Sequence, residues 1–267
     1  MAFKRSLNLI TIRHASLAAK VEVAGAAGYD GVGLWVDEVR DAAGADEDLQ
    51  AVARMLRDQR LVPAELCFVG GWMYPDPAEG ARIHERAEQA FRIAQTLGCQ
   101  CVVACASAGT GDVEDAARDF AGLCARAQPF GVRLALEFLG GAEQVKDVRT
   151  AWQIVEMADA PNGGLLIDTF HFYKGGSELS DLESVAGDKV LLVHVNDCLD
   201  LPREELEDRH RILPGTGVIP LEVIAATLVN NGYDGFFSLE LFNEEYWDTD
   251  PRLVAQEGLR SMKRAGI

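Results

Sequence analysis

Several features that mark other protein classes are missing from this sequence of 267 residues. No stretch approaches the ~18 consecutive apolar residues needed to cross a bilayer, and no apolar run follows a basic segment at the N-terminus. The six cysteines, at positions 67, 99, 101, 105, 124 and 198, include no Cys-x-x-Cys pair. We therefore expect a soluble, cytoplasmic protein whose cysteines are reduced core residues and not zinc ligands.

Basic residues are also scarce. The 25 lysines and arginines face 42 aspartates and glutamates, which gives a formal net charge of −17. Such a charge repels nucleic-acid phosphates and anionic lipids, so we expect neither nucleic acid nor a membrane as a partner. The expected partner is a small-molecule substrate, and assembly into a homo-oligomer stays open.

No linker, low-complexity tract or charge block divides the chain. Short apolar runs alternate about eight times with longer amphipathic segments, the pattern of parallel strands joined by crossover helices. The length also suits one α/β barrel. We predict a single (β/α)₈ TIM barrel domain over residues 1–267, with strands near 6–12, 31–36, 63–68, 101–106, 133–138, 164–168, 190–196 and 235–240.

Glycines mark the ends of two predicted helices. The segment 16–27 ends at Gly28 and the segment 77–97 ends at Gly98, where glycine readily adopts the backbone conformation that stops a helix. A Gly-Tyr-Asp-Gly run also precedes the second and the eighth predicted strand. This recurrence indicates equivalent helix–strand units in one domain.

Four consecutive predicted strands, the fifth to the eighth, end in an ionisable residue. The active site of a barrel lies at the carboxyl ends of its strands, so these residues are the first candidates for function. They are Glu137, Asp168, His194 and Glu240.

Each of these residues has an ordinary structural explanation when taken alone, such as capping a helix or hydrogen bonding in the core. Together they would place three carboxylates and an imidazole around one barrel mouth, an arrangement that is costly without a cation between them. The set therefore predicts a site for one divalent cation, with Mn²⁺ first and Mg²⁺, Co²⁺ or Zn²⁺ as alternatives. Such a cation activates a ketone and stabilises an enediolate.

Two further polar residues follow these strands. His171 lies three residues after Asp168, and Arg211 lies in the loop after the seventh strand. Each can be an ordinary loop residue, or each can bind substrate oxygens if the loop covers the barrel mouth. Arg209 lies two residues before Arg211, and the sequence does not decide which of the two arginines would bind substrate.

Aromatic residues near the second and third strand ends are candidates for the walls of the pocket. Trp35, Phe68 and Trp72 could contact the C–H face of a polyol ring. Core packing is the alternative, most of all for Phe68.

Five short segments of the second half of the chain resemble the xylose isomerase-like sugar phosphate isomerase/epimerase superfamily, and within it the branch that acts on inososes (2-keto-myo-inositol). The first half resembles it more loosely, at Asn8 and residues 28–30. The segments are residues 129–138, 167–172, 194–197, 214–217 and 238–242.

The resemblance implies roles for the candidate residues. Glu137, Asp168, His194 and Glu240 would bind the metal, and Glu137 and Glu240 would also act as acid and base on opposite sides of the substrate. His171 and an arginine at or near position 211 would contact the substrate. The implied reaction is isomerisation or epimerisation of a polyhydroxy ketone through a metal-stabilised cis-enediolate, with isomerisation of an inosose favoured.

Several alternatives share this scaffold. Ketose 3-epimerase and hydroxypyruvate isomerase lie within the preferred class, and an inosose dehydratase would expel a hydroxyl from the same enediolate. An abasic-site endonuclease needs more metal ligands at the third and fourth strand ends, where residues 68–71 and 106–109 offer none, and its DNA substrate does not suit the negative charge. A barrel that binds a polyol without catalysis is disfavoured by the presence of both glutamates.

The charge of the loops predicts the charge of the substrate. Phosphate in such barrels is commonly held after strands seven and eight by glycine-rich backbone. Here the loop 243–250 has four carboxylates and no basic residue, and acidic residues outnumber arginines in 197–211. The turn 214–217 could offer backbone amides, but we expect a neutral ketone.

Overall fold

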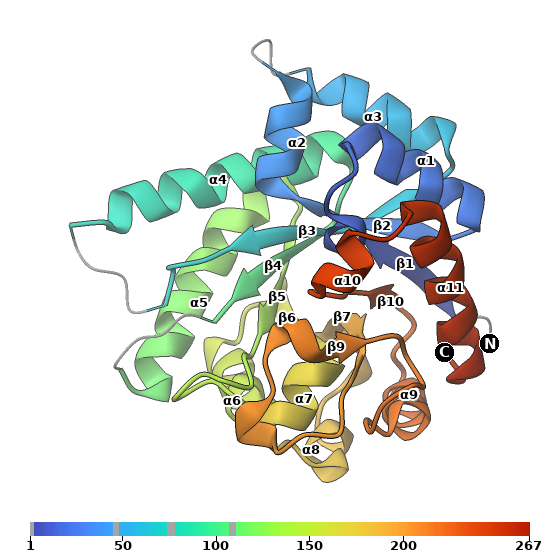
Figure 1. The fold of residues 1–267 in the computed structure, drawn as a ribbon. Coiled ribbons are helices and arrows are strands. Elements are labelled where there is room, and N and C mark those ends of the chain that lie inside the picture. The colour runs from blue at the N-terminus through green and yellow to red at the C-terminus, as the bar shows by residue number, and fades with distance from the viewer. Residues whose placement is uncertain (1–2, 45–47, 74–77, 107–110) are drawn as a thin grey trace.

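A computed structural model describes residues 3–44, 48–73, 78–106 and 111–267 of the chain (Figure 1). Within these residues, eight parallel strands close into a barrel in the order β1-β10-β7-β6-β5-β4-β3-β2. The TIM barrel prediction is thereby confirmed. The barrel strands are β1 (Lys4–Asn8), β2 (Gly31–Trp35), β3 (Val62–Val69), β4 (Cys101–Cys105), β5 (Arg133–Glu137), β6 (Gly163–Asp168), β7 (Val190–Val195) and β10 (Phe236–Leu239).

Helices surround the barrel, and β1 pairs with β10, which closes it (Figure 1). The side chain of Arg5 donates a hydrogen bond to the carbonyl of Ile267, 2.8 Å away. The α-helices are α1 (Leu17–Ala27), α2 (Val36–Ala43), α3 (Leu49–Asp58), α4 (Gly80–Leu97), α5 (Val113–Ala127), α6 (Val148–Ala158), α7 (Thr169–Gly175), α8 (Leu179–Glu183), α9 (Leu221–Asn230), α10 (Glu244–Trp247) and α11 (Pro251–Arg264).

The long loop after β7 contains a small hairpin. Its two strands, β8 (Asp197–Cys198) and β9 (Arg211–Ile212), pair antiparallel and bring Arg211 back toward the barrel. The remaining short elements are 3₁₀ helices, which are η1 (Leu9–Ile12), η2 (Gln128–Phe130), η3 (Gly187–Lys189), η4 (Arg203–Glu205) and η5 (Asp208–His210).

The first strand is shorter than the predicted segment 6–12. It ends at Asn8, whose side-chain oxygen accepts a hydrogen bond from the backbone N–H of Ile10 at 3.2 Å. This bond caps η1, so residues 9–12 turn into a 3₁₀ helix in place of extending the strand.

The predicted helix ends are confirmed. Gly28 and Gly98 adopt left-handed backbone angles, with φ of 92° and 74°, and their N–H groups bond to the last turns of α1 and α4. The hydroxyl of Ser16 caps the start of α1 by accepting from the N–H of Ala19. The predicted start of the second helix, Pro77, lies outside the described residues, within which α4 begins at Gly80.

Alternate residues of each strand point to opposite sides of the barrel wall, which divides the apolar core in two. The larger cluster lies between strands and helices and includes Leu134 and Leu136 of β5. A smaller cluster fills the barrel interior and includes Ala135 between them, together with Cys67 and Cys101. All six cysteines are unbridged, and five are buried, as their apolar surroundings predicted. Among the described helices, none combines the length and hydropathy required of a membrane span.

Candidate active site

Four ionisable side chains meet at the carboxyl end of the barrel, where neighbouring strands β5, β6, β7 and β10 end. Each offers a ligand atom that lies within 4.8 Å of the others, and all four residues are buried. The strand register aligns Asp168 with His194, and His194 with Ser238, two residues before Glu240. The structure thus brings together the four predicted metal ligands, Glu137, Asp168, His194 and Glu240.

The imidazole of His194 faces all three carboxylates with one nitrogen. Its Nδ1 lies 3.2 Å from Glu240 Oε2, 3.6 Å from Glu137 Oε1 and 3.8 Å from Asp168 Oδ2. Among the described residues, this buried nitrogen has no hydrogen-bond partner. A single point near Nδ1 is therefore within reach of four ligand atoms.

The charges of the cluster affect one another strongly. Burial raises the pKa of Glu137. Burial opposes a charged imidazole at His194, yet Glu240 and other neighbours raise the pKa of His194 well above its usual range. The three carboxylates therefore favour a positive charge beside the imidazole. Either a proton on the ring or a bound cation can provide it. This donor set, three carboxylates and an imidazole nitrogen without a partner among the described residues, fits a divalent cation.

Arg211 lies beside two of the candidate ligands. Its Nη1 donates to Asp168 Oδ2 at 2.7 Å and to Glu240 Oε2 at 2.9 Å, and its side chain is only 2% exposed. Asp208 Oδ1 accepts from the other side of the guanidinium, at 2.9 Å from Nη2. The three carboxylates are thus partly compensated by a side chain, which the sequence argument for a cation did not include. Arg209, by contrast, is exposed and pairs with Glu207, so Arg211 is the arginine at the site.

His171 lies next to Arg211. Its Nε2 is 3.2 Å from Nη2 of Arg211, and burial lowers the pKa of His171 to about 4. A guanidinium can only donate, so Nε2 accepts from Arg211, and a neutral imidazole then carries its proton on Nδ1. The other ring nitrogen, Nδ1, is buried without a hydrogen-bond partner in the part of the chain that the structure describes.

Asp168 has both a structural and a site role, one for each carboxylate oxygen. Oδ1 accepts from the backbone N–H of His171 at 3.0 Å and so caps α7, while Oδ2 faces Arg211 and His194. Burial disfavours the charged form, but Arg211 and the two histidines hold the pKa of Asp168 well below its usual range. The ordinary explanation of this residue, a helix cap, is therefore correct and compatible with metal binding.

A cavity of about 550 Å³ opens above the cluster, a volume suited to a small molecule. Trp35 and Phe68 line it with their ring centroids 5.9 Å apart, and Phe242 packs against Trp35 at the same distance. The predicted positions of Trp35 and Phe68 at the pocket agree with the structure. Sequence reasoning did not single out Phe242, Phe170 or Lys174, which also line the cavity.

Trp72 does not line this cavity, so the prediction that it forms a wall of the pocket was wrong. The side chain is 3% exposed, its Nε1 donates to the carbonyl of Cys105 at 3.0 Å, and its ring packs 5.5 Å from that of Phe120 on α5. These contacts hold the indole between the barrel wall and the helices. The segment 106–109, at the end of the fourth strand, was predicted to offer no metal ligand. The structure describes only Ala106 of this segment, and residues 107–109 lie outside the described residues.

The glycine-rich turn 214–217 does not leave its amides free. The carboxylate of Asp197 accepts from the N–H groups of Gly215 and Gly217 at 3.0 and 2.8 Å, and from that of Ile219 at 2.9 Å. A Cβ on Gly217 would lie 2.1 Å from the carbonyl of Cys198, so close packing also requires glycine here. The turn is thus a structural corner stabilised by an aspartate.

Comparisons with known proteins agree with the fold. Residues 21–265 match the protein family described as xylose isomerase-like TIM barrel. A crystal structure of the IolI protein with a bound zinc atom is similar with a TM-score of 0.93 and 25% identity, over 98% of both chains.

Two relatives differ in their named activities. An inosose isomerase of Halalkalibacterium halodurans is 39% identical over 51% of this chain and 48% of its own length. A 3-dehydroshikimate dehydratase of Pseudomonas aeruginosa is 31% identical over 97% of this chain and 41% of its own length. The chain thus spans about half the length, or less, of these relatives.

Proposed function

Since the chain belongs to the xylose isomerase-like TIM barrel family, we propose that it is a metal-dependent isomerase or epimerase of a neutral polyhydroxy ketone. An inosose is the preferred substrate and isomerisation the preferred outcome. The observation that carries the proposal is the group of four buried strand-end ligands beneath a cavity of about 550 Å³. The similarity to inosose isomerases supports the substrate class.

Glu137, Asp168, His194 and Glu240 would hold one divalent cation, with Mn²⁺ preferred and Zn²⁺, Mg²⁺ or Co²⁺ as alternatives. When bound, the cation would act as a Lewis acid that polarises the ketone and favours loss of the neighbouring proton. Glu137 and Glu240 approach from different strands, β5 and β10, so they can serve as acid and base on opposite sides of a substrate. His171 and Arg211 would hydrogen-bond to substrate oxygens, Arg211 by giving up one of its present contacts with Asp168, Asp208, Glu240 or His171. Trp35 and Phe68 would contact the C–H face.

Screening by NMR in D₂O tests this function. Protein loaded with Mn²⁺ is incubated with inososes and free ketoses, and interconversion is followed together with deuterium incorporation at the carbon beside the ketone. Isomerisation through an enediolate predicts a new isomer of the same molecular formula that carries deuterium from the solvent. The absence of both interconversion and label with every neutral ketone would contradict the proposal.

A dehydratase is the second candidate, because a 3-dehydroshikimate dehydratase is similar over 97% of this chain. Dehydration begins with the same proton abstraction, after which a hydroxyl leaves in place of reprotonation. Mass spectrometry of the products separates the two reactions, since dehydration lowers the mass by one water and isomerisation leaves it unchanged. 3-Dehydroshikimate is included in the same screen.

The roles of the two histidines predict opposite results from alanine substitution. His171→Ala should leave metal content near that of the wild type and weaken substrate binding by about 3- to 10-fold in KM, the effect of one lost hydrogen bond. His194→Ala should lose most of the metal, because a ligand nitrogen is removed. Metal content by atomic absorption and KM by the NMR assay check both, and a metal-free His171→Ala protein would make His171 a ligand.

The proposed neutral substrate is tested with a matched pair of ketoses, one free and one phosphorylated. The amides of the turn 214–217 are already bonded to Asp197, and acidic loops surround the barrel mouth, so a dianion should gain little here. We expect the free ketose to have the same or higher kcat/KM. A phosphorylated ketose favoured by more than about tenfold, or ~1.4 kcal/mol, would contradict this expectation.

A further inference from the structure

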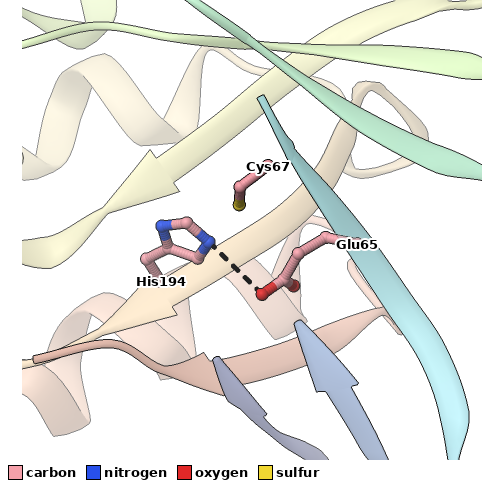
Figure 2. A group of neighbouring side chains, drawn as sticks. All are labelled: Glu65, Cys67 and His194. Carbon is pink, nitrogen blue, oxygen red and sulfur yellow. Dashed lines mark ion pairs between the residues drawn. The ribbon is translucent and has the colours of Figure 1, made fainter. Parts of the chain in front are cut away.

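A fifth ionisable residue, Glu65 of β3, lies inside the barrel below the site. Its side chain is fully buried, and its Oε1 lies 3.6 Å from Nε2 of His194 (Figure 2). The other ring nitrogen, Nδ1, is the one that lies near the three carboxylates. Neither Nε2 of His194 nor Oε2 of Glu65 has a hydrogen-bond partner among the described residues. The function proposed above does not use this carboxyl group.

We propose that Glu65 is a positioning residue for His194, a proposal that rests on the metal site proposed above. A histidine binds a metal through a nitrogen that carries a lone pair, so the proton must be on its other nitrogen and needs an acceptor there. Glu65 is the acceptor beside Nε2, which leaves Nδ1 free to face Glu137, Asp168 and Glu240. The carboxyl group thereby selects the ring tautomer and the ring orientation that bind a cation.

Several contacts hold the carboxyl group of Glu65 in place. Its Oε1 accepts from Oγ of Ser238 at 2.8 Å and from Nδ2 of Asn8 at 3.1 Å. Ser238 is the register neighbour of His194 on the next strand, so the anchor and the imidazole share one part of the sheet. Asn8 also donates to Oε1 of Glu240 at 3.2 Å and accepts from Nε1 of Trp35 at 2.8 Å, which links Glu65 to the site above it.

The sequence leaves room for this carboxyl group at Gly33 of β2. A Cβ added to Gly33 would lie 1.8 Å from Oε1 of Glu65 and 3.0 Å from Nδ2 of Asn8. Any side chain at this position would force the carboxyl group out of its present place. The contact between Glu65 and His194 therefore requires glycine at position 33.

A second cation among Glu65, Cys67 and His194 is the competing explanation, because these side chains form a group of possible ligands (Figure 2). The amide Nδ2 of Asn8 argues against it, since it donates to Glu65 at 3.1 Å and faces the sulfur of Cys67 at 3.6 Å. A cation bound there would meet a hydrogen-bond donor. The contacts therefore favour the positioning role.

The test is the affinity for Co²⁺ and Zn²⁺ of Glu65→Gln, measured by competition with a chelator. One oxygen of Glu65, Oε1, faces Ser238, Asn8 and Nε2 of His194, and glutamine can keep an oxygen there. The substitution therefore removes the negative charge of the acceptor and not the acceptor itself. We expect affinity to fall by about 10- to 100-fold, the range for mutation of such a partner, and the visible absorption spectrum of the Co²⁺-loaded protein to change. Gly33→Ala, which displaces an intact Glu65, should reduce affinity in the same direction.

Ser6→Ala is the matched control. Ser6 is also fully buried in the barrel, and its hydroxyl has no hydrogen-bond partner within the described residues, so this variant should keep wild-type affinity and spectrum. Urea unfolding of all metal-free variants shows whether they are folded. A purely structural role would lower the stability of metal-free Glu65→Gln and leave its metal affinity and Co²⁺ spectrum unchanged.

Three results would overturn the inference. Wild-type affinity and spectrum in Glu65→Gln would show that the carboxyl group does not position His194. Two metal ions per chain, with equal losses in Glu65→Gln and Cys67→Ser, would establish the second cation site instead. A wild-type protein that binds neither metal would overturn the proposed function as well, whereas the first two results leave that function standing.

Discussion

Replacing Glu240 with glutamine is expected to slow exchange of the substrate's reacting proton with solvent by about 10²- to 10⁴-fold, the usual contribution of a general base. The amide has nearly the same shape and keeps an oxygen toward the site, but it cannot take up a proton. Oε2 of Glu240 lies 3.2 Å from Nδ1 of His194, so part of the metal binding should also be lost. Deuterium incorporation by NMR at saturating metal isolates the effect on proton transfer.

Glu156→Gln is the matched control for this experiment. Glu156 lies exposed on α6, outside the barrel, and the same change of charge there should leave exchange at the wild-type rate. Glu137→Gln should resemble Glu240→Gln if the two glutamates act on opposite sides of the substrate. Exchange at the wild-type rate in Glu240→Gln would reduce Glu240 to a metal ligand and move the base elsewhere.

Metal removal by a chelator is expected to lower kcat by at least about 100-fold. A Lewis acid contributes several kcal/mol to the barrier of such a reaction, and each ~1.4 kcal/mol is a factor of ten. Addition of Mn²⁺, Co²⁺ or Mg²⁺ should restore activity, and Zn²⁺ is tested beside them because the similar IolI structure contains zinc. Metal content is measured in parallel, and full activity in protein shown to be free of metal would contradict the mechanism.

The cluster of ionisable residues at the strand ends could be predicted from the sequence, because the alternation of side chains along a strand determines which of them face the barrel interior. In β5, β6, β7 and β10 the ionisable residues lie at or beside the last position, and alternation turns them into the barrel with Ala135, Leu166 and Leu192. The same rule would have found Glu65, which lies two residues before Cys67 in the apolar strand β3. A glutamate inside an apolar strand segment is itself unusual and would have indicated Glu65. It was missed because the prediction considered only residues at strand ends.

The residues that the sequence could not place are those whose position depends on loops and side-chain contacts. Arg211 reaches the cluster because the β8–β9 hairpin returns the chain to the barrel, and no local pattern separates it from Arg209. Trp72 was expected at the pocket, but a hydrogen bond to the carbonyl of Cys105 and the ring of Phe120 hold it elsewhere. The end of β1 could not be predicted either, because it is set by one hydrogen bond, from the N–H of Ile10 to the side chain of Asn8.

The contacts of Arg211 have a consequence for how the protein matures. Its guanidinium bonds to Asp168 and Glu240 while Asp208 holds it from behind, so the acidic centre of the barrel has an internal counter-ion. The chain can thus complete its fold before any cation arrives, because the repulsion among the carboxylates is already reduced. At the proposed metal site, cation binding would then follow folding, and the barrel would not depend on the metal for its assembly.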